Sequence, residues 1–517
     1  MGKRFFIILA VAVVAAAAGG WLACRWYRVF QQKATDAVEV KTVLPEALPE
    51  PESEAAPEPV TVSAGDFKCK NCNIVIISLT NTRKGHLGIY GYQRATSKNI
   101  DGFFNDSIVF GNAYAPASWT LPVSASLYSS LFPYSHGVMD RYDGSRLSDD
   151  VLTLTEILSD NGYKTAGFTG GGDYNRSFNI SQGFDFYLDE TNYAEHGIIE
   201  EIDPSGRKDT PPAAYLSIEK LAPLAVKWLK ENKGEKKFLL LQGFDSHCPF
   251  TPKEPFAGLF DTDYKGKVDF SNCLWTFEQT KPVFEKGVRY WNLKTAYTKE
   301  GIKDVKMTDR DVEHMLALYD AEIAQADSYL EDFFRYAEES GMDKDTIFIF
   351  MSEHGDLFGE HGRFMRGGPL RGTFYNPVLN FPLLIKLPWI KGRVRMDSLS
   401  QTVDIMPTLL DILGLQDPQK ETRQGKSLVP ALSGNGEVNK YVYAASKYKA
   451  INNPFFNGVS VVEAIADTEW KLIRERIYDA DSTKKLSDSY ELYNISKDPK
   501  EEKDLHRAGN KEAKVLD

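Results

Sequence analysis

The chain has 517 residues, of which 42% are hydrophobic and 12% aromatic, and its formal net charge is -11. This length allows a large buried core and more than one domain, and the acidic balance excludes nucleic acid as a general partner. The five cysteines are too few for a disulfide scaffold, and Cys69-Lys-Asn-Cys72 lacks the second pair of a typical zinc site. Outside the cytosol, a local disulfide between these two cysteines is the favoured interpretation.

The N-terminal residues are predicted to lie outside the folded part of the chain. Residues 5–23 are uncharged and follow Gly2-Lys3-Arg4, a pattern long enough for a signal sequence or a single membrane-spanning anchor. We therefore assign residues 1–27 to a leader. Residues 28–71 are rich in Pro, Glu and Ala without periodicity, which predicts a disordered linker. The protein is expected to be exported, either anchored and facing the periplasm or extracellular side, or secreted if the leader is cleaved.

Three short apolar runs predict buried strands: residues 74–79, 238–244 and 346–351. The last run is too short for a helix and too apolar for a strand with one wet face, which is typical of a parallel sheet covered on both sides. In such sheets, the carboxyl ends of the strands carry the ligands and the chemistry. Polar residues follow the runs at these ends: Thr80 and Asn81, then Asp245 and His247, then Glu353 and His354.

The pair of Glu353 and His354 has the chemistry of metal ligands, since it places a carboxylate beside an imidazole. An isolated Glu-His-Gly is more often a solvated turn, so the pair alone does not identify a metal site. His361, in the nearby Gly-Glu-His-Gly, is assigned a structural role. Gly170 to Gly172 lack the spacing of a nucleotide-binding loop.

Thr120 lies in a proline-containing loop just ahead of a helical segment predicted from about Val123. A hydroxyl at a helix N-terminus faces unpaired backbone N–H groups and the positive end of the helix dipole. This setting suits a nucleophile that attacks an anionic ester. The structural alternative is an ordinary helix cap.

In their order and spacing, these segments resemble the sulfatase family of the alkaline phosphatase superfamily, from Asn73 to about Pro499. NAYAPASWTLPVSASL is similar to the nucleophile loop of that family, FDSHCPFTP to its substrate-binding histidine loop, SEHGDLFGEHG to the end of its second metal strand, and YELYNISKDP to its C-terminal ending. The resemblance implies an α/β fold, an alkaline-phosphatase-like sandwich. A large, mainly parallel central sheet flanked by helices would span residues 72–435, and a small C-terminal antiparallel sheet subdomain would span residues 436–517.

The resemblance also implies a metal site and a nucleophile, both altered in this chain. The metal positions carry Thr80, Asn81, Glu353 and His354, with one carboxylate among four residues, and we expect a divalent ion such as calcium, zinc or manganese. Thr120 stands where formylglycine-dependent members carry Cys or Ser, so no formylglycine is expected. A threonine at this position resembles the phosphoester and phosphonate hydrolases of the superfamily.

The remaining candidate residues follow from the same resemblance. His247 is expected to donate to a substrate oxygen or to protonate the leaving group, and Arg371, Arg83 and Ser124 are expected to bind the substrate. Ser124 replaces the usual Arg or His of the family. Residues 195–310 carry little family pattern and are expected to determine specificity.

Two hypotheses about function remain open on the sequence alone. The first is a metal-assisted hydrolase of sulfate esters, or of related phosphate or phosphonate esters, with Thr120 as nucleophile. The second is a catalytically degenerate domain that binds an anionic glycan or lipid headgroup without turnover. In either case the expected partners are a small anionic ester or a sulfated glycan or lipid headgroup, and a membrane through the N-terminal segment, but no nucleic acid.

Overall fold

A computed structural model describes residues 67–140, 145–198, 215–271, 273–275, 280–298, 301–366, 373–450 and 457–506. The predicted leader, most of the predicted linker and Arg371 lie outside these residues. Within the described ranges, we find no helix with both the length and the apolar character that crossing a bilayer requires.

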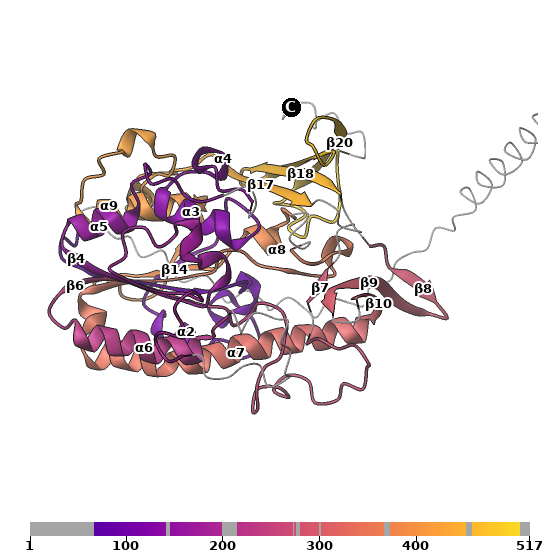
Figure 1. Ribbon diagram of the computed structural model, residues 1–517, viewed down its shortest axis with the longest axis horizontal. Helices are drawn as coiled ribbons and strands as arrows, with labels where there is room; N and C mark the ends of the chain where they lie inside the picture. The colour runs from indigo at the N-terminus through magenta and orange to yellow at the C-terminus, as the bar shows by residue number, and fades with distance from the viewer. Residues whose placement is uncertain are drawn as a thin grey trace, which may run out of the picture. The chain divides into compact units, whose positions relative to one another are not determined.

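An eight-stranded mixed sheet forms the centre of the fold (Figure 1). Five neighbouring strands, β11, β1, β6, β4 and β5, pair in parallel, while β14 is antiparallel to both β11 and β2. The predicted mainly parallel sheet is therefore confirmed. In spatial order the strands are β15 (Val394–Met396), β2 (Ile108–Phe110), β14 (Leu383–Lys386), β11 (Thr346–Met351), β1 (Asn73–Leu79), β6 (Lys236–Gly243), β4 (Tyr163–Thr169) and β5 (Phe186–Leu188).

Helices cover both faces of this sheet, because alternate residues of each strand point to opposite sides. In β1, Ile74 and Ile76 pack into the core on one side, and Val75 and Ile77 pack into the core on the other. Figure 1 shows the two layers. One contains α3 (Thr120–Ser129), α5 (Leu154–Asp160) and α9 (Ile405–Leu413), and the other contains α2 (Lys98–Phe103), α6 (Ile218–Glu231) and α7 (Asp309–Glu339).

The helix predicted from about Val123 begins three residues earlier, at Thr120. Trp119 is the N-cap residue, and Pro122 lies in the first turn, where its missing N–H costs no helical hydrogen bond. The prediction placed Thr120 ahead of the helix because a proline often marks a boundary. Its true place in the first turn leaves the Thr120 side chain available for the site.

The C-terminal subdomain contains a four-stranded antiparallel sheet, as the sequence predicted. Its strands are β17 (Val442–Ala450), β18 (Gly458–Ala466), β19 (Trp470–Tyr478) and β20 (Lys485–Asn494). A second small sheet was not predicted. It is formed by β7 (Leu274–Trp275), β8 (Val283–Glu285), β9 (Val288–Thr298) and β10 (Gly301–Thr308), within the segment that carries little family pattern.

A buried ion pair of the C-terminal subdomain is hydrogen-bonded to Asn376 of the main domain. Lys471 Nζ lies 2.5 Å from Glu501 Oε1, and the side chains are 1% and 0% exposed. Asn376, in α8 (Asn376–Leu379), bonds both partners: its Oδ1 accepts from Lys471 at 3.0 Å and its backbone N–H donates to Glu501 at 2.6 Å. The three side chains therefore connect the two parts of the fold.

Replacing Lys471 with methionine is expected to lower the free energy of unfolding by about 3–5 kcal/mol, because it leaves the Glu501 carboxyl buried without its cation. Urea denaturation measures the change. The matched control is Lys485→Met, which breaks the pair with Asp488 at a position where the lysine is 49% exposed, and which should cost below about 1 kcal/mol. Equal losses in the two variants would contradict the buried pair.

Candidate active site

The candidate site lies at the carboxyl end of three neighbouring strands, β11, β1 and β6. Because these strands are parallel, the residues that follow each of them meet at one edge of the sheet. Close packing at this edge depends on Gly355. A Cβ at that position would lie 2.1 Å from the carbonyl oxygen of Pro377, so only glycine allows the approach.

Thr120 and His354 meet although 234 positions separate them in the chain. Thr120 Oγ1 lies 3.4 Å from His354 Nε2, and both residues are buried. His354 Nδ1 lies 2.9 Å from the carbonyl oxygen of Gly355, which only accepts, so Nδ1 carries the proton. Burial, and secondarily the nearby Arg366 cation, lower the pKa of His354 to about 3. The neutral ring therefore presents the Nε2 lone pair toward the Thr120 hydroxyl.

Glu353 is fully buried beside β1. Its Oε1 accepts a hydrogen bond from Ser78 at 3.0 Å, while its Oε2 has no hydrogen-bond partner. Burial raises the pKa of Glu353, and its own backbone N–H and the hydroxyls of Tyr174, Ser78 and Thr80 oppose this rise. The Thr80 hydroxyl also accepts from Gln242 Nε2 at 2.5 Å. The carboxylate thus has one unsatisfied oxygen at the edge of the sheet.

Asp356 belongs to the same cluster, although the sequence analysis did not assign it a role. Its Oδ2 accepts from Asn81 Nδ2 at 2.9 Å, and the remaining oxygens, Asn81 Oδ1 and Asp356 Oδ1, are buried without a hydrogen-bond partner. Asn81 adopts a left-handed backbone conformation, with φ of 71°, which asparagine tolerates better than most residues. Burial, opposed mainly by Arg366, raises the pKa of Asp356 to about 6.

Arg366 is the cation that the sequence analysis missed. It follows β13 (Phe364–Met365) and is 5% exposed. Its Nη1 lies 3.1 Å from His247 Nε2 and 3.9 Å from Asp356 Oδ1. The family spacing pointed to Arg371 instead, which lies outside the described residues. The only feature of the sequence that could have indicated Arg366 was its place five positions before Arg371.

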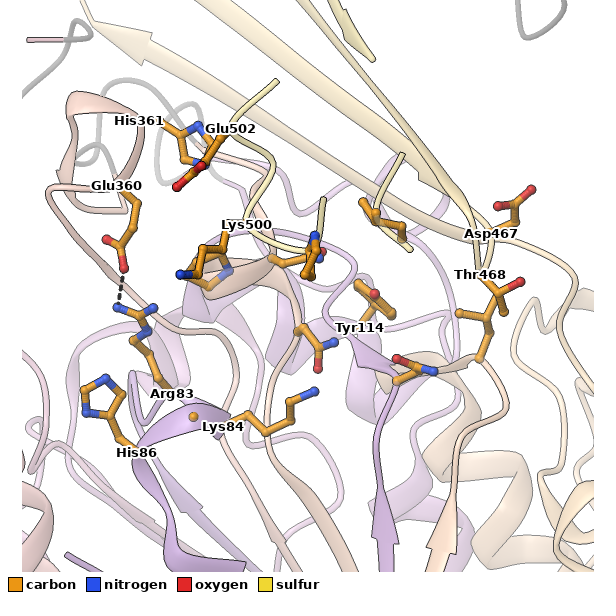
Figure 2. Close-up of a pocket in the computed structure, with 18 of the residues that line it drawn as sticks. Arg83, Lys84, His86, Tyr114, Glu360, His361, Asp467, Thr468, Lys500 and Glu502 are labelled. Atoms are coloured by element: carbon orange, nitrogen blue, oxygen red, sulfur yellow. Dashed lines mark ion pairs between the residues drawn. The ribbon is translucent and has the colours of Figure 1, made fainter. Parts of the chain in front are cut away.

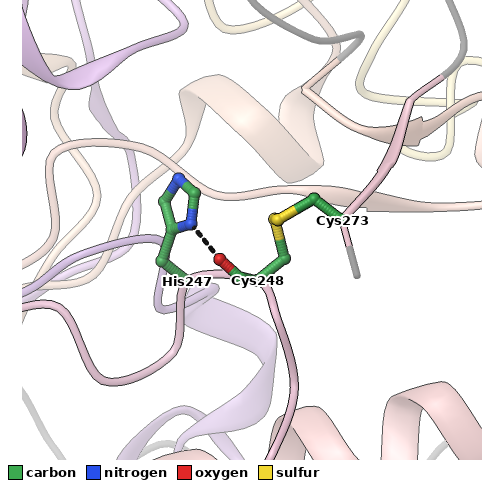
Figure 3. Close-up of side chains that lie close together, drawn as sticks. All are labelled: His247, Cys248 and Cys273. Carbon is green, nitrogen blue, oxygen red and sulfur yellow. Dashed lines mark hydrogen bonds between the residues drawn. A yellow bond between two sulfur atoms is a disulfide. The ribbon is translucent and has the colours of Figure 1, made fainter. Parts of the chain in front are cut away.

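His247 accepts a hydrogen bond from Arg366 through Nε2, since its other ring nitrogen, Nδ1, already donates to a carbonyl oxygen. Nδ1 lies 2.6 Å from the Cys248 carbonyl oxygen and must donate, which leaves Nε2 as the acceptor for Arg366. The ring stacks on Phe244 at a centroid distance of 4.2 Å. Figure 3 shows the imidazole beside the disulfide of Cys248 and Cys273. His247 is thus positioned to orient the guanidinium.

Two disulfides occur among the described residues. Cys69 and Cys72 form the local disulfide that the sequence favoured. Cys248 and Cys273 form the other, which ties the His247 loop to the segment before β7 and was not predicted. Within the described ranges, the only three His, Cys, Asp or Glu side chains with ligand atoms within 4.8 Å of one another are His247, Cys248 and Cys273. Because both sulfurs are in a disulfide, these residues do not form a metal site.

Two residues that were predicted to bind the substrate, Ser124 and Arg83, contact other groups than Thr120 Oγ1. The Ser124 hydroxyl donates to the Leu121 carbonyl at 2.9 Å inside α3. Arg83 pairs with Glu360, with 2.9 Å between Nη1 and Oε1, and lines a separate cavity of about 1160 Å³ (Figure 2). Neither Thr120 nor Arg366 is among the described residues that line this cavity.

His361 lines the same cavity, and its ring stacks on Tyr375 at 3.5 Å. This contact agrees with the structural role expected for His361. Burial lowers the pKa of His361 to about 4, so the ring is neutral at neutral pH.

The His247 loop is held in place by two buried carboxyls. Asp245 accepts from the backbone N–H of Ile218 at 2.9 Å, and Glu322 accepts from that of Thr251 at 2.8 Å. Burial is the main cause that raises the pKa of Asp245 to about 7 and that of Glu322 to about 8. Both groups are therefore expected to be protonated in the folded protein at mildly acidic pH.

Glu322→Gln is expected to stabilise the protein increasingly as the pH rises. The folded-state pKa of Glu322 lies above its unfolded value, so the stabilisation from its protonated form is complete below about pH 4.5 and lost toward about pH 8. Glutamine keeps the acceptor for Thr251 and does not ionise. The gain relative to wild type should grow by up to about 1.4 kcal/mol per pH unit in urea unfolding across this window. Glu331→Gln, at an exposed position of α7, is the control. A gain that does not vary with pH would contradict the burial of this carboxyl.

The donor types near Thr120 are those of a divalent-cation site. Three buried oxygens, Asn81 Oδ1, Glu353 Oε2 and Asp356 Oδ1, lack hydrogen-bond partners, and the lone pair of His354 Nε2 faces Thr120 Oγ1. Among the described residues, Glu353, His354 and Asp356 do not bring three ligand atoms within 4.8 Å of one another, so they would have to draw closer to share one ion. Carboxylate, amide and imidazole donors are those that calcium, manganese or zinc accept in proteins. The distance of 3.4 Å between Thr120 Oγ1 and His354 Nε2 is near the upper limit for a hydrogen bond and suits two ligands of one ion.

Comparisons with known proteins identify the family that this chain resembles. The sulfatase family profile matches residues 72–415, and the profile for the C-terminal part of N-sulphoglucosamine sulphohydrolase matches residues 359–516. Arylsulfatase K of Rattus norvegicus is 25% identical over 379 residues, which cover 70% of this chain and 63% of that protein. The N-acetylglucosamine-6-O-sulfatase of Bacteroides thetaiotaomicron is 23% identical over 480 residues, covering 84% and 82% of the two chains.

The fold is shared with solved structures. The phosphonate monoester hydrolase of Agrobacterium radiobacter superposes with a TM-score of 0.60 at 20% identity, covering 86% of this chain and 93% of that chain. At this level of identity the superposition supports the fold alone.

Proposed function

Because the chain belongs to the sulfatase family, which the match over residues 72–415 establishes, we propose that it hydrolyses esters of a sulfur or phosphorus oxyacid with Thr120 as the nucleophile. The observation that carries this proposal is the meeting of Thr120 and His354, 3.4 Å apart, beside the buried Arg366. The fold does not require a hydroxyl, an imidazole and a guanidinium from distant segments to be buried together. Their meeting therefore supports a catalytic function.

Arg366 is proposed to bind the anionic group of the substrate. A guanidinium presents several N–H donors in one plane and binds two oxygens of a tetrahedral anion at once. His247 holds Nη1 from one side by accepting its hydrogen bond at 3.1 Å. We assign His247 as a positioning residue for Arg366, in place of the direct donation to substrate expected from the sequence.

Thr120 Oγ1, after giving its proton to solvent, would attack the sulfur or phosphorus atom and break its bond to the leaving oxygen, which takes a proton from solvent. The resulting threonyl ester would then be hydrolysed by water. The hydroxyl needs help to ionise, because its unperturbed pKa is far above neutrality. Thr120 is the first residue of α3, where the positive end of the helix dipole favours the alkoxide. The helix dipole makes this contribution to the stability of the alkoxide without any further residue.

Asn81, Glu353, His354 and Asp356 would hold a divalent cation, with Thr80 supporting Glu353 through its hydroxyl. Such an ion, when bound, would supply positive charge that lowers the pKa of the nearby hydroxyl and neutralises the substrate oxygens. The proposal keeps the predicted ligands Asn81, Glu353 and His354 and adds Asp356. Since threonine does not form formylglycine, no such modification is involved.

Removing divalent metal should destabilise the protein measurably, because three buried oxygens without a hydrogen-bond partner would lose a ligand. We expect calcium, manganese or zinc, added to the chelator-treated protein, to raise the melting temperature, by an amount that follows RT ln(1 + [L]/Kd). Asp356→Asn should weaken this shift, because it removes one of the two carboxylates. Asp261→Asn, away from this edge of the sheet, is the control. No shift with any of the three ions would contradict the metal assignment.

The natural substrate is proposed to be a sulfated glycan. The supporting observation is that the Bacteroides relative is named for a sulfatase acting on N-acetylglucosamine-6-O-sulfate groups. We also propose that the protein is exported, with residues 1–27 as its leader. Its two disulfides support this, since such bonds persist mainly outside the cytosol.

A substrate panel tests the proposed activity. The metal-loaded protein would be assayed with aryl sulfate, aryl phosphate, aryl phosphodiester and aryl phosphonate esters, and its metal content measured in the same preparation. Turnover of any ester above background supports the hydrolase, and the preferred ester identifies the transferred group. Tight binding of sulfated oligosaccharides with no turnover would instead support the degenerate binding domain.

A further inference from the structure

A groove of about 580 Å³ lies between residues 132–135 of the main domain and the C-terminal sheet, and Thr120 is not among the residues that line it. Its walls are aromatic, with Tyr134 from α4 (Pro133–His136) and Tyr443 from β17 exposed by 53% and 44%. Phe132 packs edge-on against Tyr443 at 5.8 Å, and Tyr490 of β20 lines the groove as well. Large exposed tyrosines that gather in one groove indicate a binding surface.

The charged side chains in this groove are already neutralised. Arg474 donates to both oxygens of Asp488, at 3.0 and 2.9 Å, and lies over the Tyr490 ring at 5.2 Å. Glu463 accepts from the Tyr134 hydroxyl at 2.9 Å and from Arg476 at 2.5 Å. A charged ligand would find no free counter-charge in these pairs. The groove suits an uncharged ligand with flat apolar faces and hydroxyl groups at its edges.

Helix α3 and strand β17 both lie between the groove and Thr120, and their lengths give similar values for the distance between these two places. Helix α3 has ten residues and extends from Thr120 toward α4, which corresponds to about 15 Å (Figure 1). In strand β17, the stretch from Tyr443 to Tyr448 corresponds to about 17 Å. The Tyr448 hydroxyl lies 2.6 Å from that of Ser118, two residues before Thr120. Because α3 is buried along its whole length and Tyr448 is buried as well, an oligosaccharide would pass over the surface and would have to be longer than this separation.

We propose that the groove binds an uncharged sugar ring of the same glycan whose charged ester group reaches Thr120. This inference rests on the proposed glycan substrate. A pyranose ring offers one apolar C–H face to Tyr134 or Tyr443 and directs its hydroxyls to the polar groups beside them. The volume is within the range of sites for ligands of this size. The groove would hold a polymeric substrate in place and would contribute nothing to a small ester.

The test uses the full chain and two readouts. Saturation-transfer NMR would measure binding of neutral N-acetylchitotetraose and maltotetraose, and kcat/KM would be compared for an aryl ester and a heparin or chondroitin sulfate oligosaccharide. We expect Tyr134→Ala and Tyr443→Ala each to weaken binding of the neutral oligosaccharide, and kcat/KM for the sulfated one, by up to about tenfold. Activity on the aryl ester should stay unchanged.

Two further variants separate ring stacking from general effects on the fold. Tyr134→Phe keeps the ring and should retain most of the oligosaccharide binding, and Leu486→Ala, which changes another exposed apolar side chain, should behave as wild type. Unchanged oligosaccharide binding in both alanine variants, no binding by wild type, or binding of lipid vesicles or peptides in place of sugar would overturn the inference. Because NMR detects binding without turnover, an inactive enzyme would refute the proposed function and leave this result readable.

Discussion

Thr120→Ala is expected to abolish ester hydrolysis, with kcat reduced by about 10³-fold or more, because the variant lacks the oxygen that attacks the substrate. The fold should survive. Thr120 is 6% exposed, its hydroxyl contacts His354 Nε2 at 3.4 Å, and it is replaced by the residue with the highest helix propensity. The measurement is kcat with the preferred ester of the substrate panel, together with a thermal melt.

Thr120→Ser is the matched control for this prediction. Serine retains the hydroxyl at the first position of α3, so a substantial part of the activity should remain. Metal content should be similar in the alanine and serine variants, since Asn81, Glu353, His354 and Asp356 are unchanged. Full activity in Thr120→Ala would show that another group attacks the ester, and the proposed mechanism would have to be abandoned.

Replacing Arg366 with methionine is expected to lower kcat/KM by about 10²–10³-fold, equivalent to about 2.7–4 kcal/mol, because the buried donor to the substrate anion is lost. Arg366→Lys should recover only part of this loss. Lysine keeps the charge but does not offer the planar pair of donors. Steady-state kinetics on a small aryl ester measures the effect, and circular dichroism checks that the buried substitution leaves the fold intact.

Arg83→Met is the control for Arg366, because it removes another arginine that forms a short ion pair, in the neighbouring cavity. We expect its effect on kcat/KM to be much smaller. If His247 acts through Arg366, then His247→Ala should cost little more in the absence of Arg366, and the two effects should not add. Additive effects would assign His247 an independent role in the reaction, such as protonation of the leaving group.

The strands and the parallel sheet could be predicted because their signal is local. Residues 346–351 are uniformly apolar, and all six are buried in β11. The start of α3 was misplaced by three residues, since Pro122 is compatible with both a loop and a first helical turn. The sheet containing β8 to β10 was missed because its charged and aromatic residues follow no clean alternation.

Only the site residues that directly follow a predicted strand could be predicted from the sequence. Thr80, Asn81, Glu353 and His354 follow β1 and β11, and these strands are neighbours. Asp356 and Arg366 were missed because each lies in an irregular segment or turn beyond a strand end, where spacing no longer determines the direction of a side chain. The approach of Thr120 to His354 was expected from the family resemblance and agrees with the structure.

The sequence by itself determined the buried strands, because hydrophobic periodicity is a property of short segments, and its resemblance to the sulfatase family implied the class of fold and the type of chemistry. Only the tertiary structure decided which charges act together. The direction of a side chain after a strand, the neighbour of each buried oxygen and the bond between His247 and Arg366 all depend on contacts across more than a hundred residues. Such contacts arise from packing of the whole sheet, which no local pattern encodes.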